Sequence, residues 1–196
     1  CDNQNVYTFG NINGTIDQEG TAIVDIFDVM ELVDILLNDN QESCGSEIAD
    51  MNSDGNQNVV DIIFLVQMLL GGDFESISYY DPGLFEIDNS GIDTKISISS
   101  DLKIGGFQFT TSLGEVSEND LSSLILPTGW VVEYVVNNQK LNVLIFDMSG
   151  QNSVETLDLK FSSVSSNSFQ DIVLANGNAQ QIEYTIMEKD TEQIDI

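Results

Sequence analysis

The chain of 196 residues carries 33 acidic side chains against five lysines, and it contains no arginine and no histidine. Its net charge of −28 argues against binding to nucleic acid or to anionic membrane surfaces, because phosphate recognition needs clustered lysine or arginine. Its hydrophobic content of 41% suits one or two globular domains, and no apolar run approaches the ~18 residues of a membrane span. The excess of carboxylates favours cation binding, or a very salty or calcium-rich environment.

The charges are distributed unevenly, because the first lysine of the chain is Lys95. Without counter-cations, the carboxylates of the preceding 94 residues would repel one another. This asymmetry indicates two domains with different roles. We divide the chain into an all-α domain at residues 1–73, a linker at 74–83 and an all-β sandwich at 84–196, which makes the fold class α+β multidomain.

Two segments with the same apolar spacing predict an internal repeat. Residues 28–37 place apolar side chains at helical intervals, and residues 61–70 superimpose on them without a gap, at an offset of 33 residues. Asp28 matches Asp61, and Gly71 follows the second segment as a helix stop. We therefore expect two equivalent helices, each preceded by an equivalent loop.

The loop before the second helix has the ligand spacing of an EF-hand calcium loop. Residues 50–61 read D-x-N-x-D-G-x-x-N-x-x-D, with oxygen-bearing side chains at positions 1, 3, 5, 9 and 12. Calcium takes six to eight oxygens, so the chain must wrap around it and turn sharply, which Gly55 permits because it lacks a Cβ. The predicted ligands are Asp50, Asn52, Asp54, the backbone carbonyl of Asn56, Asn58 and Asp61.

The loop before the first helix supports two alignments. Counting back twelve positions from Asp28 gives an equivalent spacing, although Ala22 stands where the turn glycine is expected. Alternatively, residues 10–13 match residues 49–52, which makes the first loop six residues longer and substitutes Asn11 and Asn13 as ligands. A degenerate loop that binds nothing is the third possibility. We predict a second Ca²⁺ site with the ligands of the first alignment: Asp17, Glu19, Thr21, Ile23, Asp25 and Asp28. Asp25 and Asp28 are ligands in both alignments.

Two cysteines, Cys1 and Cys44, bear on the cellular location. In a secreted protein they could form a disulfide that ties the N-terminus to the segment between the two helices. Alternatively, Cys1 could be the lipid-modified N-terminus of a lipoprotein. We favour the disulfide, and with it a secreted or cell-surface protein.

Residues 9–72 resemble a dockerin module. The resemblance lies in two short calcium loops, each followed by one helix with the pattern D-x-x-x-L-V-x-x-L-L. Residues 24–28 and 58–61 also look like the dockerin phrase V-N-x-x-D, although Gln57 replaces the valine of the second copy. The resemblance implies a module that folds around two calcium ions and docks onto cohesin modules through exposed helix faces.

After the turn Asp81-Pro82-Gly83, the apolar periodicity changes from 3.6 to 2. Many short alternating segments separated by turn residues are typical of a β-sandwich. Strands are expected around Ile96–Ile98, Phe107–Phe109, Val131–Val136, Leu141–Phe146, Leu157–Phe161, Ile172–Leu174 and Ile182–Ile186.

Residues 84–187 resemble a cohesin module, less closely than the first part resembles a dockerin. The resemblance rests on the phrase G-F-Q-F at residues 106–109 and on a later strand with L-x-L-x-F at 157–161. The glycine-rich turn expected before Leu157 is replaced by residues 151–155. The two resemblances together imply that both halves of a recognition pair lie on one chain.

We expect no enzyme, because the chain has no histidine or arginine and only two cysteines, while carboxylate pairs are unavoidable among 33 acids. The favoured function is non-catalytic, calcium-dependent extracellular assembly. If the dockerin-like part of one copy docks on the cohesin-like part of the next, the contact is heterologous and yields a filament. One alternative is an anchoring module whose two parts pack on each other and bind a different cohesin or dockerin partner. Another is a carbohydrate-binding module that stacks sugars on Trp130 and tyrosines.

Overall fold

The computed structural model describes residues 6–38, 43–72, 74, 80–162 and 164–189. A helical part precedes a β part, and the first β-strand begins at Gly83, the last residue of the expected linker. The helical part consists of α1 (Ile26–Asn38), a 3₁₀ helix (Cys44–Ile48) and α2 (Val59–Leu69). The β part contains β1 (Gly83–Asp88), β2 (Thr94–Ser112), α3 (Glu118–Ser122), β3 (Trp130–Asn137), β4 (Lys140–Asp147), β5 (Val154–Phe161), a 3₁₀ turn (Ser166–Ser168), β6 (Gln170–Asn176) and β7 (Tyr184–Lys189).

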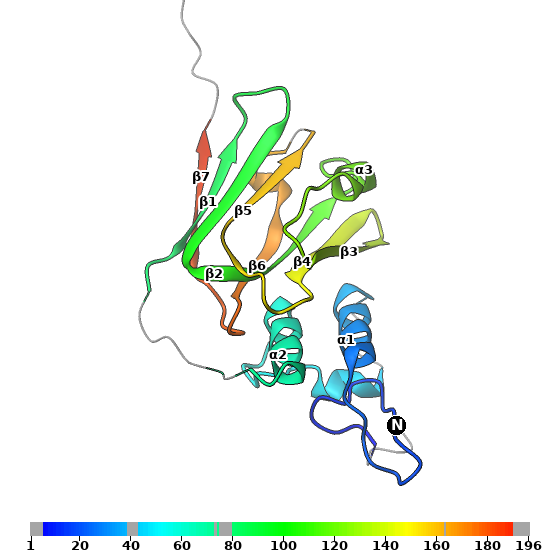
Figure 1. Ribbon diagram of the computed structural model, residues 1–196. Helices are drawn as coiled ribbons and strands as arrows, with labels where there is room; N and C mark the ends of the chain where they lie inside the picture. The colour runs from blue at the N-terminus through cyan, green and yellow to red at the C-terminus, as the bar shows by residue number, and fades with distance from the viewer. Residues whose placement is uncertain (1–5, 39–42, 73, 75–79, 163, 190–196) are drawn as a thin grey trace, which may run out of the picture.

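The 19-residue strand β2 organises the β part (Figure 1). Its first half pairs with β1 and β5, and its second half pairs with β4 and β6. The pairing of β2 with β5 shifts register between Ser99 and Ile104, where the strand passes from one layer to the other. β7 extends the first layer parallel to β1, and β3 extends the second layer antiparallel to β4. The strands thus form two facing layers, as the periodicity predicts.

One hydrophobic core fills the space between the layers. It includes Phe85 from β1, Phe107 and Phe109 from β2, and Phe161 from β5, all of them essentially buried. Trp130 also lies in this core at 7% exposure, and its indole N–H donates to the backbone oxygen of Asn152 at 2.8 Å. Trp130 is therefore a core residue and does not provide an exposed stacking surface for sugars.

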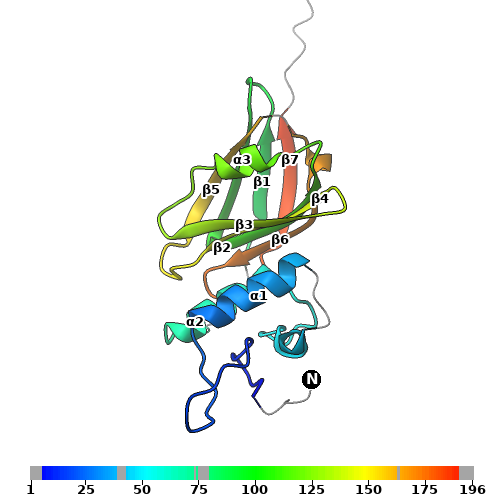
Figure 2. The same ribbon diagram turned by 90° about the vertical axis from the view of Figure 1, so that its right-hand side faces the viewer.

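A second hydrophobic core lies between the two long helices and the outer face of the layer β3-β4-β2-β6. α1 lies over β3 and β4, and α2 lies over β6, β2 and β4. Figure 2 shows both helices on the same side of the sandwich. β4 contributes to both cores, because Val143 and Ile145 face the sandwich interior while Leu144 and Phe146 face the helices. The helical part therefore shares its apolar core with the β part.

Candidate calcium loops and the helix–sheet interface

The loop before α2 closes on its first residue. The carboxylate of Asp50 accepts hydrogen bonds from the backbone N–H groups of Asp54, at 3.1 Å, and Gly55, at 2.9 Å. Gly55 has φ +90°, and an added Cβ would meet nothing within 4 Å, so glycine is required here for backbone conformation rather than for space. Asn52 and Asn56 both donate from their side-chain amides to the Asp54 carboxylate. Three of the predicted ligands, Asp50, Asn52 and Asp54, are thus joined by hydrogen bonds within the loop.

The last loop residue, Asp61, reaches back to the beginning of the loop. Its fully buried carboxylate accepts hydrogen bonds from the backbone N–H groups of Met51 at 2.7 Å, Asn52 at 3.2 Å and Asn58 at 2.9 Å. Burial raises the pKa of Asp61 to about 6, with a further contribution from the charge of Asp50, although the three backbone donors act in the opposite direction. A cation in the loop would relieve the cost of this buried charge.

The loop before α1 repeats this pattern around Asp28, which is also fully buried. The Asp28 carboxylate accepts hydrogen bonds from the backbone N–H groups of Asn13 at 3.0 Å and Asp25 at 2.7 Å. Asn13 therefore takes the place of Asn52 in the second loop, and Asp25 takes the place of the N-cap residue Asn58. This geometry favours the longer alignment, in which the first loop starts at Asn11.

The six additional residues form a small exposed hairpin. The Asp17 carboxylate accepts hydrogen bonds from the backbone N–H groups of Glu19 at 2.9 Å and Thr21 at 2.8 Å. A bridge between Ile16 and Ala22 closes the hairpin, and the backbone N–H of Ile23 donates to Thr15. The predicted ligands of this segment are thus engaged in a local turn, whereas Asn13 and Asp25 contact Asp28.

Asn11 supplies the observation that best supports an ion in the first loop. Its side chain is fully buried, and its amide nitrogen donates to the backbone oxygens of Val6 at 2.6 Å and Thr15 at 3.0 Å. Its amide oxygen has no hydrogen-bond partner within the described part of the chain. A buried oxygen without a donor is costly, and coordination of a hard cation would satisfy it. The residues of the longer alignment therefore fit a calcium site.

Both loops contain neutral side chains among their candidate ligands. No group of three or more His, Cys, Asp or Glu side chains that could hold a metal ion is found in the described ranges. The remaining oxygens would come from the amides of Asn11, Asn13, Asn52 and Asn58 and from backbone carbonyls. Calcium accepts such amide and backbone oxygens as well as carboxylates.

The predicted disulfide falls partly outside the described residues. Cys44, in the 3₁₀ helix between the two long helices, is disulfide-bonded. Cys1, its predicted partner, lies outside the described residues.

Two glycines allow α2 to approach the sheet closely. A Cβ on Gly106 of β2 would come within 2.6 Å of the Val59 side chain, at the first turn of α2. A Cβ on Gly150, which follows β4, would come within 2.5 Å of the Leu70 side chain and 2.8 Å of the Val66 side chain, near the end of α2. A Cβ at either position would have to displace these side chains, so both ends of α2 pack closely against this face of the sandwich.

Three hydrogen bonds that involve amide side chains join the helices to the sandwich. The carbonyl oxygen of the Gln108 side chain accepts from the backbone N–H of Val59 at 2.9 Å, and Asn142 donates to the backbone oxygen of Leu37 at 2.8 Å. Gln67 of α2 donates to the backbone oxygen of Gly150 at 2.8 Å. The first two bonds satisfy backbone groups at helix ends that have no partner within the helix. The interface between the helices and the sheet therefore combines an apolar core with directional hydrogen bonds, which fix how the helices lie on the sheet.

The second calcium loop leads directly into this interface. Asn58, its ninth position, caps α2 by accepting from the backbone N–H of Val60 at 2.8 Å. The intervening residue, Val59, contacts Gln108 and Gly106 of β2. A change in the loop conformation would consequently move the residue that fits against the sheet.

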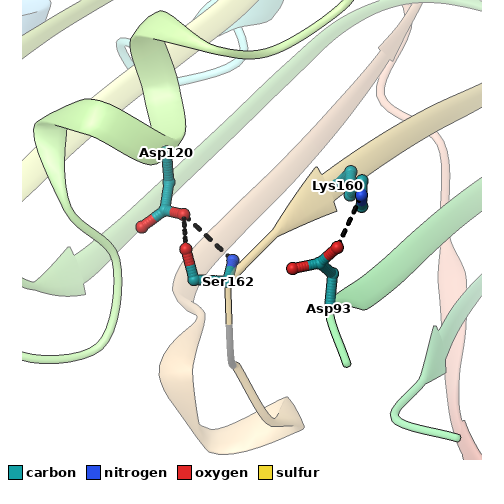
Figure 3. Close-up of polar contacts among 4 residues, drawn as sticks. All are labelled: Asp93, Asp120, Lys160 and Ser162. Atoms are coloured by element: carbon teal, nitrogen blue, oxygen red, sulfur yellow. Dashed lines mark hydrogen bonds and ion pairs between the residues drawn. The ribbon is translucent and has the colours of Figure 1, made fainter. Parts of the chain in front are cut away.

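A separate polar cluster joins α3 to the residue that follows β5 (Figure 3). Asp120 of α3 accepts hydrogen bonds from Ser117 and from both the backbone N–H, at 2.9 Å, and the hydroxyl of Ser162. Burial acts to raise the pKa of Asp120, but these hydrogen bonds outweigh it and hold the pKa below its ordinary value. The neighbouring ion pair between Lys160 and Asp93 is solvent-exposed, so it contributes little to stability.

Comparison with known proteins found matches among solved structures. No family model matches the chain, and no curated protein matches it. Among solved structures, a non-cellulosomal cohesin from the hyperthermophilic archaeon Archaeoglobus fulgidus is similar over 58% of this chain and 95% of that chain, at 13% identity and a TM-score of 0.33. Within the described residues, no helix is both long and apolar enough to cross a membrane.

Proposed function

We propose that this chain is a non-catalytic, calcium-dependent protein–protein interaction module in which a dockerin-like helical part pairs with a cohesin-like sandwich. The fitted contact between α2 and the outer face of the sheet carries this proposal. Its core is apolar, and Gly106 and Gly150 leave no room for larger side chains beneath the helix. Such complementarity is a property of recognition interfaces.

Calcium would act by making the helical part foldable. Asp28 and Asp61 are buried beside the first turns of their helices, and no lysine lies in the first 94 residues to balance them. Because burial of these two carboxylates is costly, binding of the ions would contribute directly to the free energy of folding. Loss of the ions would release the helices and uncover Leu144 and Phe146 on the sheet.

Self-assembly would require an exchange of helices. The sheet face suited to the helices is covered by α1 and α2 of the same chain. In a head-to-tail filament, the helices of each copy would leave their own sheet and occupy that of the next copy, which preserves every contact and adds no new interface. We propose this exchange as the route to a homopolymer, with the closed single chain as its unassembled form.

An extracellular location agrees with the same features. The disulfide at Cys44 favours an oxidising compartment, and millimolar calcium sites are typical of extracellular modules.

Calcium titration followed by sedimentation velocity tests both parts of the proposal. We expect helical circular dichroism to fall on chelation, and we expect calcium-loaded protein at high concentration to form species larger than a monomer. A calcium-loaded protein that stays monomeric at the highest attainable concentration would refute the filament. Circular dichroism that ignores both chelator and calcium would refute the calcium dependence.

A second candidate function is anchoring to a different protein, and one asymmetry of the repeat favours it. Phe27 and Met30 of α1 are 62% and 55% exposed, whereas the equivalent Val60 and Ile63 of α2 are at most 1% exposed. Large apolar side chains on one helix face mark a contact surface. Pull-down with the calcium-loaded chain as bait separates the candidates, because a filament recovers the chain itself and an anchor recovers a distinct protein.

A further inference from the structure

β3 is an edge strand with little protection against pairing. It pairs with β4 through eight successive residues without a shift in register, and β4 is its strand partner within the described residues. Proteins usually guard such edges with charges, prolines or bulges. The sequence of β3, WVVEYVVN, contains one charged residue, Glu133, and no proline.

The other edge strands are guarded. β5 carries Glu155, Asp158 and Lys160 along eight residues, and β6 pairs with β2 through two shifts in register. β7 is only six residues long and ends in Glu188 and Lys189. Among the described strands, β3 is thus the edge on which an added strand would meet the least opposition.

An apolar groove runs beside this edge. It lies between α1 and the outer face of β3 and has a volume of about 320 Å³. Val33 and Leu37 of α1 form one wall, and Val131 and Val135 of β3 form the other. Two exposed carboxylates, Asp34 on the helix and Glu133 on the strand, also line the groove. Apolar side chains would therefore be accepted in its floor and cationic side chains at its rim.

We propose that the β3 edge and this groove bind an extended segment of another protein, which adds to the sheet as a strand beside β3. In this mode, main-chain hydrogen bonds supply affinity and pockets for alternate side chains supply specificity. The segment would place apolar side chains between α1 and β3 and lysine or arginine near Asp34 and Glu133. The surface differs from the contact between α2 and the sheet, so the inference does not rest on filament formation. It requires α1 to lie on β3 of the same chain, and the calcium dependence of the proposed function therefore enters only as the condition that calcium is present.

Charge decides against a second copy as the occupant. A second copy of this chain would have only five lysines to offer the acidic rim of the groove. Two of these cations are already paired, Lys160 with Asp93 and Lys189 with Glu86. The partner is therefore a different protein that contributes a basic, alternating apolar segment.

Selection of peptides provides the test. Random ten-residue peptides displayed on phage are selected against the calcium-saturated full chain, and a selected peptide is synthesised for fluorescence anisotropy. We expect alternating apolar and basic residues, with affinity reduced about tenfold in Asp34→Lys/Glu133→Lys. Glu155→Lys, which reverses a charge on the guarded edge of β5, is the matched control and should leave affinity unchanged.

Hydrogen exchange distinguishes strand addition from other binding. The bound peptide should slow exchange of backbone amides in β3 while leaving those of β5 unaffected, in the presence of saturating calcium throughout. Failure to select any peptide that responds to the double charge reversal would overturn the proposal. So would equal weakening by Glu155→Lys, or protection confined to residues outside β3 and α1.

Discussion

The backbone N–H of Asn13 donates to the carboxylate of Asp28 at 3.0 Å, as that of Asn52 does to Asp61 at 3.2 Å. The helices repeat at an offset of 33 residues (61 − 28), whereas the loop starts repeat at 39 (52 − 13). The difference of six residues is the exposed hairpin. The two loops are thus equivalent around their last carboxylate, despite an insertion in the first.

The double variant Asp28→Ala/Asp61→Ala should abolish the helical signal gained on adding calcium. Each substitution removes a buried carboxylate that joins the two ends of its loop, so ion binding and loop closure are lost together. Circular dichroism during a calcium titration measures the effect. Full retention of the calcium response would mean that these carboxylates are not ligands.

Asn11→Ala should weaken calcium binding to the first loop, while Asp17→Ala should leave it nearly unchanged. Asn11 presents the buried, unpartnered oxygen, and Asp17 stabilises only the exposed hairpin turn. Isothermal titration calorimetry resolves the affinity of each site. The opposite ranking would restore the shorter alignment, in which Asp17 is the first ligand.

Gly106→Val should detach α2 from the sheet. The new side chain would overlap that of Val59, and overpacking of this kind costs about 1–3 kcal/mol of unfolding free energy. Urea denaturation measures the loss, and binding of an apolar dye should rise as Leu144 and Phe146 are uncovered. Gly114→Ala is the control, because a Cβ there meets only the Ser112 hydroxyl at 4.0 Å.

Asp120 should make the sandwich sensitive to acid. Its folded-state pKa is depressed, so its ionised form stabilises the fold above the ordinary pKa of 3.8, and this contribution is lost as pH falls through the lower folded-state value. Thermal unfolding between pH 7 and pH 2 should therefore show a steeper acid loss for the native chain than for Asp120→Asn. Parallel curves would contradict the assigned role.

The conformation of a candidate calcium loop can be predicted from the sequence when all its specified positions lie in one continuous stretch. Residues 50–61 contain every specified position in one uninterrupted stretch, so their fold follows from the spacing. The first loop could not be aligned with certainty by counting, because the hairpin insertion separates Asn13 from Asp25. The hydrogen bond between Asn13 and Asp28 in the folded chain favours the longer alignment.

The β part shows a similar division. Alternation predicts its strands, but it places Ile96–Ile98 and Phe107–Phe109 in separate segments, whereas both belong to β2. The interruption between them coincides with the passage from one layer to the other. Packing of the helical part on the sandwich of the same chain is expected only in the anchoring alternative. The sequence of β4 supports that alternative, since a strand with apolar residues at both odd and even positions is buried on both faces.

The four partners of β2 have a consequence for biosynthesis. The strand ends at Ser112, yet its neighbours β4, β5 and β6 follow it, and the last of them ends at Asn176. Most of the chain must therefore be synthesised before β2 can pair with all its neighbours. Until then, part of β2 has no strand partner. Such long-range pairing makes folding slow and leaves nascent strands vulnerable to association. The helical part, whose contacts are more local, would be synthesised first but could not settle on its sheet until this late step.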